Sequence, residues 1–264
     1  MKVGIIGYGS MGKMIVTQML GTGAVSKNDM YLSNRTFSKI EPLKDSCNIC
    51  KSNTELASKS DIVFICVKPG DIKSVLAEIS EAVRPETLIV SLNANILLDS
   101  LKEVFDHKTA KVVPSVTAEI GRSQTLVCFN DKVPECDKEM LKDLLGCMGD
   151  VYELRENEIG MGSELVSCMP GFITSMFDVI CASAGRHIPF SEEQILQMVT
   201  RTLDATGELV MKKGMSFGDI VKRVATPGGV TEEGTKVIYE KFPEIADKVF
   251  EVTLAKRKVI AAGK

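Results

Sequence analysis

Short apolar runs alternate with amphipathic segments along the first 150 residues or so of the chain. The apolar runs predict eight strands, at residues 2–6, 30–33, 48–51, 62–67, 87–92, 110–113, 125–129 and 151–154. Strands that alternate with helices are typical of βαβ units, which build a parallel sheet. The run at 62–67 is continuously apolar rather than alternating, as in strands covered by helices on both faces.

The pattern changes after about Asn157, where roughly a hundred residues follow without a convincing strand. The segment 192–213 has apolar residues at three- and four-residue spacing, which predicts an amphipathic helix. The segment 158–185 is apolar on nearly every face, so a helix there needs to be buried on all sides. A half-domain of this size offers little bulk to enclose it, and we therefore expect a homodimer or higher homo-oligomer.

These patterns predict an α/β fold with two domains that join directly through a helix. Residues 1–157 are expected to form a Rossmann domain with a doubly wound, mostly parallel sheet. Residues 158–264 are expected to form a smaller all-α domain for dimerisation and substrate binding.

The composition of the 264-residue chain is that of an ordinary globular protein. It is 44% hydrophobic and 25% charged, with a net charge of -3, which gives no reason to expect nucleic acid or an anionic membrane as partner. Gly4, Gly7, Gly9 and Gly12 interrupt the first apolar run, so it does not resemble a signal peptide. No stretch has the about 18 uninterrupted apolar residues of a membrane span, and we expect a cytoplasmic protein.

Eight cysteines are scattered along the chain, and only Cys47 and Cys50 form a CxxC pair. A zinc site needs two further ligands, and both histidines, His107 and His187, lie far away in sequence. We therefore predict no metal site and reduced, mostly buried thiols. A redox role for Cys47 and Cys50 is the alternative.

The sequence GxGxxG occupies residues 7–12, directly after the first predicted strand and before a helical pattern. In this setting Gly7 makes a tight turn, Gly9 lets the backbone approach a pyrophosphate, and Gly12 lets the helix pack closely on the strand. The first helical turn, with Ser10 and Met11, then directs free N–H groups at the pyrophosphate. The motif predicts a dinucleotide site.

The end of the second strand indicates which dinucleotide binds. NAD-selective sites carry an Asp or Glu there, about 20 residues beyond the glycines, whereas this chain reads Ser33-Asn34-Arg35-Thr36. The Arg35 guanidinium offers donors to a 2′-phosphate, and neighbouring hydroxyls add to them. We predict NADPH rather than NADH, with a solvated Arg35 as the alternative.

Two further loops follow strands at the edge where α/β sheets bind ligands. Val67-Lys68-Pro69 closes the fourth strand, and Ser91-Leu92-Asn93 closes the fifth. We expect both loops, Asn93 included, to border the nicotinamide and its ribose. Lys68 as a solvated loop lysine is the alternative.

A Pro-Gly-Gly turn stands near the C-terminus, within Thr226-Pro227-Gly228-Gly229-Val230-Thr231. Such a turn exposes backbone N–H groups, and Thr231 suits the start of the following helix. With the hydroxyls of Thr226 and Thr231, the turn is an anion-binding nest that fits a substrate carboxylate. Taken alone, this segment is more typical of a plain helix–helix turn.

With these residues in place, the sequence resembles the pyrroline-5-carboxylate reductase family, which performs the last step of proline synthesis. The resemblance runs from end to end: GxGxMG at 7–12, the NADP-reading stretch at 34–36, the VKP loop at 67–69, and V-[ST]-[ST]-P-G-G-x-T at 224–231. It further implies that Asn53 contacts the cofactor. The chain is also similar to divergent paralogues of this reductase in Gram-positive bacteria, some of them associated with competence.

Three departures from the family pattern fall on the substrate side. The family's M-P-N-x-P reads Val-Pro-Ser-Val-Thr at 113–117, and its S-G-S-G-P-A-[YF] reads Val-Ser-Cys-Met-Pro-Gly-Phe at 166–172. Arg223 stands where an Asn is common in the family. An extra cation there either strengthens binding of the same anion or selects a different acid.

The resemblance implies an oxidoreductase that transfers a hydride from NADPH to the C=N carbon of 1-pyrroline-5-carboxylate, a small anionic imine acid. The implied substrate residues are Arg223, Thr226, Gly228, Gly229 and Thr231. A non-catalytic NADPH-binding paralogue with a regulatory role is the first alternative, because of the substituted segment 166–169. A β-hydroxyacid dehydrogenase is the second, although the catalytic Lys of that class is missing from 158–185.

Overall fold

The structure, a computed structural model, describes residues 1–261. Its first part is an eight-stranded sheet with the order β3-β2-β1-β4-β5-β6-β7-β8, in which only the β6–β7 pair is antiparallel. The strands are β1 (Val3–Ile6), β2 (Met30–Ser33), β3 (Asn48–Ile49), β4 (Ile62–Ile65), β5 (Leu88–Ser91), β6 (Thr109–Val113), β7 (Ser123–Phe129) and β8 (Gly149–Glu153). All eight predicted strands are therefore present, with ends shifted by no more than two residues.

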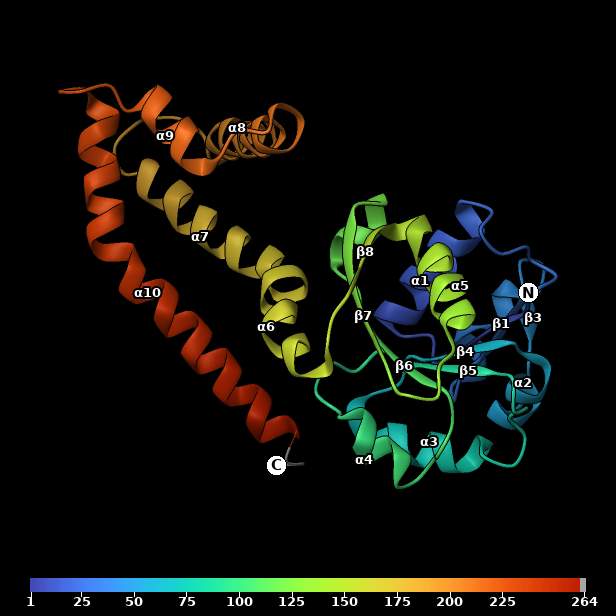
Figure 1. The fold of residues 1–264 in the computed structure, drawn as a ribbon. Helices are drawn as coiled ribbons and strands as arrows, with labels where there is room; N and C mark the ends of the chain where they lie inside the picture. The colour runs from blue at the N-terminus through green and yellow to red at the C-terminus, as the bar shows by residue number, and fades with distance from the viewer. Residues whose placement is uncertain (262–264) are drawn as a thin grey trace. The chain divides into compact units, whose positions relative to one another are not determined.

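Helices cover both faces of this sheet (Figure 1), as the continuous apolar runs predicted. On one face α1 (Ser10–Gly21) and α5 (Glu135–Leu145) pack through residues such as Ile15 and Leu141. On the other face lie α2 (Asn53–Lys59), α3 (Ile72–Ile79) and α4 (Leu98–Lys102). Neighbouring strand residues point to opposite cores, since Phe64 packs with the first set and Ile65 with the second. The doubly wound Rossmann prediction is confirmed.

From residue 154 to residue 261 the chain is helical, without a strand. The helices are α6 (Ile159–Ser163), a π-helical turn (Glu164–Cys168), α7 (Met169–Ala184), α8 (Glu192–Lys213), α9 (Phe217–Val224) and α10 (Val230–Ala261). The bounds of α8 match the prediction for 192–213: Ser191 accepts from the N–H of Gln194, and Gly214 ends the helix at φ +63°. Pro170 has no N–H to donate to the turn before it, which favours the local π conformation.

The chain divides into two compact units at a position that differs from the predicted boundary at 157. The first unit contains residues 1–170 together with the end of the chain from Lys256, and the second contains Gly171–Ala255. The boundary lies later because α6 packs on the sheet, with Ile159 1% exposed. As expected, one continuous helical stretch leads from the first unit into the second.

The segment 158–185 is expected to need burial on all sides. Within this chain, however, no residue of α7, which lies in that segment, is buried. Val179 is 69% exposed and Ile180 49% exposed. Among residues 1–261, the stretch Glu156–Ala184 is also the one helix long and apolar enough to cross a membrane. An apolar helix that a second subunit covers has the same length and composition.

Candidate cofactor site and substrate loop

Gly7, Gly9 and Gly12, which follow β1, are each explained by a different feature of their surroundings. Gly7 has φ +98°, which favours glycine, and a Cβ there would lie 2.9 Å from the carbonyl oxygen of Cys66. A Cβ on Gly12 would lie 2.1 Å from the carbonyl oxygen of Gly7, so only glycine lets α1 approach the loop. A Cβ on Gly9 would meet no protein atom within 4 Å, so packing inside the chain does not explain this glycine. The open space beside it fits the close approach of a ligand that the motif predicts.

The N-terminus of α1 is built to receive an anion. Its N-cap, Gly9, supplies no side-chain acceptor, and the first turn contains no acidic residue. The N–H groups of this turn and the positive end of the helix dipole are therefore available to a pyrophosphate. The loop and the helix start fit a dinucleotide.

Asn34 ties the turn after β2 to the glycine loop. Its Oδ1 accepts from the N–H of Tyr8 at 2.9 Å, and its Nδ2 donates to the carbonyl of Thr36 at 2.9 Å. The Arg35 side chain is 87% exposed, and its nearest acid is Asp71, with Nη1 and Oδ2 3.9 Å apart. An ion pair this open leaves the guanidinium accessible to a phosphate.

Asn53, at the start of α2, is held by hydrogen bonds on both sides of its amide. Its Oδ1 accepts from the hydroxyl of Ser33 at 2.8 Å, and its Nδ2 donates to Glu78 at 2.8 Å. Ser33 itself is 4% exposed. The pair connects the end of β2 with α2 and fixes the floor of the site between them.

One cleft of about 620 Å³ in the first unit gathers most of the predicted cofactor residues. Its lining includes Gly7, Gly9, Asn34, Arg35, Thr36, Asn53, Val67 and Lys68. The other predicted residues do not line it: Ser10, Met11 and Gly12 belong to α1, Pro69 follows Lys68, and Asn93 follows β5. Sequence reasoning missed several further lining residues, among them Phe37, Lys39, Lys51, Asp71 and Glu78. Lys39, four residues after Arg35, could have been recognised in the sequence as a second cation beside Arg35.

The cysteines near this cleft are poor nucleophiles. Burial raises the pKa of the Cys66 thiol, which follows β4 beside the glycine loop. Burial also raises the pKa of Cys47, and that of Cys50 to about 11. Cys47 packs in one core and Cys50 in the other, on opposite faces of the sheet, which argues against their redox pairing. Among residues 1–261, His, Cys, Asp and Glu form no cluster that could hold a metal ion.

The predicted substrate loop joins α9 to α10 in the second unit. Gly228 has φ +74°, and the N–H of Gly229 donates to the carbonyl of Thr226 at 2.9 Å. The N–H of Gly228 donates to the Glu232 carboxylate at 2.8 Å. The turn therefore already binds a carboxylate oxygen, that of a residue the sequence reasoning missed. Arg223 is exposed on the last turn of α9.

The sheet order and the glycine loop define an oxidoreductase of the Rossmann class. A family model described as "NADP oxidoreductase coenzyme F420-dependent" matches residues 2–95, in agreement with the predicted NADPH. A second, "Pyrroline-5-carboxylate reductase dimerisation", matches residues 156–259 and supports a homo-oligomer.

Full-length relatives identify the family. The chain is 33% identical to pyrroline-5-carboxylate reductase 3 of Bacillus subtilis over 98% of this chain and 96% of that protein. It is 26% identical to ComE operon protein 4 of the same organism, over 96% and 94%. The chain therefore belongs to the pyrroline-5-carboxylate reductase family, as the sequence motifs suggested, and is an NAD(P)H-dependent oxidoreductase.

Solved structures show the same fold. The pyrroline carboxylate reductase of Plasmodium falciparum with NADP bound matches with a TM-score of 0.88 and 22% identity over 98% of both chains. The pyrroline-5-carboxylate reductase of Coxiella burnetii matches with a TM-score of 0.89 and 20% identity over 97% of both.

Proposed function

We propose that this protein reduces the C=N bond of 1-pyrroline-5-carboxylate to give proline, with NADPH as reductant. The observation that carries the proposal is the turn at Gly228, whose N–H holds a carboxylate oxygen of Glu232 at 2.8 Å. A turn that binds this carboxylate has the donors to bind that of an imine acid. The chain's kinship with full-length reductases of this family supports the same substrate.

The cofactor would be held by the cleft of the first unit. Gly7, Gly9 and the start of α1 would hold the pyrophosphate, and Arg35 with Thr36 would hold the 2′-phosphate. When bound, NADPH supplies the hydride. The loops after β4 and β5, with Val67, Lys68, Pro69 and Asn93, would set the position of the nicotinamide at the carboxyl edge of the sheet.

The substrate loop would orient the imine through its carboxylate. Gly228 offers its N–H group, Gly229 closes the turn through its own N–H to Thr226, and Thr226 and Thr231 offer hydroxyls. Glu232 needs to leave the Gly228 N–H when the substrate arrives, and Arg223 adds positive charge nearby in sequence. Because the acceptor is a C=N bond, its nitrogen takes up one proton, which would come from water directly or through the Thr231 hydroxyl, itself reprotonated by water. Catalysis then comes mainly from orientation, with reacting carbons held about 3–3.5 Å apart.

We further propose that the working assembly is a homodimer built on the helical unit, and that the enzyme acts in the cytoplasm. The exposed apolar faces of α7 and the match of the dimerisation model support the first point. Membership in a biosynthetic reductase family supports the second.

The test measures NADPH oxidation with 1-pyrroline-5-carboxylate beside a panel of neutral cyclic imines and 2-oxo acids. Thr231→Ala should lower kcat/KM for the imine acid about 10-fold, because a hydrogen bond to a charged group is lost. The dissociation constant of NADPH should stay within about twofold. If no imine acid is reduced while NADPH binds, the non-catalytic alternative is correct.

Arg223→Asn separates a working reductase from one with altered specificity. Lower turnover of pyrroline-5-carboxylate in this variant would place Arg223 in a functioning site. Higher turnover would mean that the native protein prefers another acid. If neither Thr231→Ala nor Arg223→Asn changes the kinetics, the loop is only a helix connector.

A further inference from the structure

The segment between β5 and α4, residues 92–97, is called the β5 loop here and is fixed by hydrogen bonds along its length. The N–H of Asn93 lies 3.4 Å from the Ser91 hydroxyl, and the N–H of Asn95 donates to Asn93 Oδ1 at 2.8 Å. At the far end, the N–H of Leu98 donates to Glu156 Oε1 at 2.7 Å. The loop leaves the sheet at its carboxyl edge, where ligands of α/β sheets bind.

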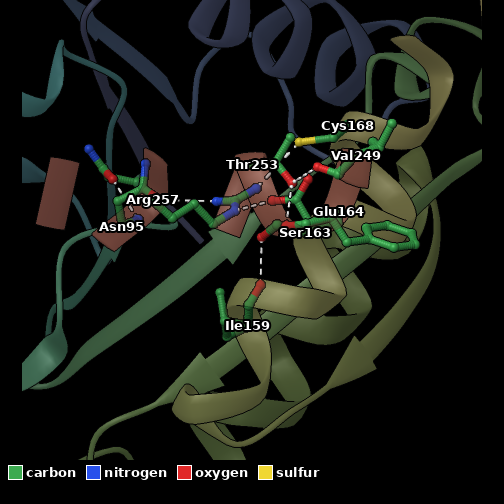
Figure 2. Close-up of polar contacts among 10 residues, drawn as sticks. Asn95, Ile159, Ser163, Glu164, Cys168, Val249, Thr253 and Arg257 are labelled. Atoms are coloured by element: carbon green, nitrogen blue, oxygen red, sulfur yellow. Dashed lines mark hydrogen bonds and ion pairs between the residues drawn. The ribbon is translucent and has the colours of Figure 1, made fainter. Parts of the chain in front are cut away.

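Arg257, near the end of α10, contacts this loop inside the first unit (Figure 2). Its Nη1 donates to Asn95 Oδ1 at 3.0 Å, and its Nε donates to Glu164 Oε1. Its Nη2 lies 3.3 Å from the sulfur of Cys168. One guanidinium thus joins three segments that are distant in sequence, and hydrogen bonds continue from it through Asn95 to Asn93.

Glu164, the acid that pairs with Arg257, is fully buried. Glu164 is 0% exposed, and its Oε2 has no hydrogen-bond partner among residues 1–261. A buried ion pair often adds little net stability, because both charges lose their hydration, so its presence points to a fixed geometry. Glu164 also opens the π-helical turn that ends at Cys168, and such turns are frequent at functional sites.

A second ion pair, between buried Lys111 and half-buried Glu156, holds the end of the loop at Leu98. Lys111 on β6 is 1% exposed, and its Nζ lies 2.6 Å from Glu156 Oε1, the atom that accepts from Leu98. The two ion pairs, Arg257–Glu164 and Lys111–Glu156, leave the β5 loop little freedom at Asn95 and at Leu98.

We propose that Arg257 is a positioning residue that fixes Asn95, and through it Asn93, at the edge of the sheet that faces the nicotinamide. The inference rests on the proposed function only for the nicotinamide's place beside this loop. A loop released from Arg257 would shift the nicotinamide against the imine, and a misplacement of about 1 Å costs up to about 100-fold in rate. Binding of the pyrophosphate and 2′-phosphate would stay unchanged, because those groups would contact the cleft, whose lining includes no residue of the β5 loop.

Asn95→Ala and Arg257→Met test the link from its two ends. The first breaks the contact without leaving Glu164 unpaired, and the second removes the cation. Both should speed amide hydrogen exchange in residues 93–98 of the cofactor-free protein and lower kcat about 10-fold or more, with the NADPH dissociation constant within threefold. Lys258→Met, the loss of an exposed neighbouring cation, should change none of these.

The double variant Glu164→Met, Arg257→Met removes the buried charge and so keeps the test valid if Arg257→Met alone fails to fold. It should regain stability while exchange stays fast and kcat low. Recovery of kcat in the double variant, or an Asn95→Ala protein with native exchange and kcat, would overturn the proposal and leave Arg257 a purely structural partner of Glu164. If no imine is reduced at all, the proposed substrate fails, and the exchange data alone judge the link.

Discussion

Arg35 is the side chain on which the choice between NADPH and NADH depends. It lies exposed beside the cleft, with Asp71 as its only close acid among the described ion pairs. Its accessibility suits a ligand phosphate, which would compete easily with a contact as open as 3.9 Å.

Arg35→Ala should therefore weaken NADPH binding by about 1.5–3 kcal/mol, the range for a hydrogen bond to a charged group. NADH binding should hardly change, because NADH lacks the 2′-phosphate. Titration of both cofactors against both proteins measures the difference. Native protein that binds NADH as tightly as NADPH would contradict the assignment.

Glu232 is predicted, at the same scale, to compete with the substrate for the loop at 226–231. Its carboxylate occupies the Gly228 N–H, so an incoming imine acid has to displace it and meets a like charge. Glu232→Gln should lower KM for pyrroline-5-carboxylate several-fold and leave a neutral cyclic imine unaffected. Glu233→Gln is the matched control, since Glu233, like Glu232, pairs with Lys236 but makes no hydrogen bond to Gly228 within residues 1–261. An unchanged KM in Glu232→Gln would show that the contact has no effect on binding.

His107 should make stability depend on pH. Burial lowers its pKa below the ordinary 6.5, and its Nε2 is buried without a hydrogen-bond partner in residues 1–261. As pH falls through 6.5, the unfolded chain binds the proton first, so the free energy of unfolding decreases until the native histidine also titrates. Chemical denaturation between pH 8 and 5.5 measures this effect. The free energy of unfolding should decrease less in His107→Gln than in His187→Gln, which changes an exposed histidine. Equal slopes would exclude His107 as the cause.

At the scale of elements, the glycines in and beside α1 differ in what surrounds them. Gly12 faces the backbone of Gly7, whereas Gly9 and Gly21 have open space around a built Cβ. The three positions therefore give three different expectations for the same substitution to alanine.

Gly12→Ala should destabilise the protein by about 1–3 kcal/mol, the usual cost of overpacking. Gly9→Ala should leave stability nearly unchanged and weaken NADPH binding about 10-fold. Gly21→Ala should stabilise by about 0.4–1 kcal/mol, because the unfolded chain loses freedom. Thermal unfolding with and without NADPH distinguishes the three, and a Gly9→Ala protein with native affinity would contradict the placement of the pyrophosphate.

At the scale of the whole molecule, the helical unit depends on a second copy for its apolar cover. Val179 on α7 is 69% exposed, and Ile120 in the first unit is 71% exposed. Val179→Lys should convert the oligomer to monomer in light scattering at micromolar concentration, because a buried unpaired charge is unfavourable at an interface. Ile120→Lys should leave the mass unchanged. A native protein that is a stable monomer and binds no hydrophobic dye would contradict the assembly.

The sequence by itself determined the elements and part of the lining of the cleft in the first unit. Periodicity and glycine restrictions act over a few residues, so all eight strands, α8 and the loop at 7–12 could be predicted directly. The carboxyl ends of parallel strands then bring Asn34, Asn53 and Lys68 to one edge, a consequence of topology alone.

Only the tertiary structure decided which charges meet. Arg257 lies 93 residues from Glu164, and Lys111 lies 45 residues from Glu156, and sequence periodicity does not encode contacts at such separations. The same holds for the compact boundary at Pro170, which depends on α6 packing against the sheet. Glu232 shows the limit at short range: the residue was plain in the sequence, but the direction of its side chain depends on the left-handed turn at Gly228.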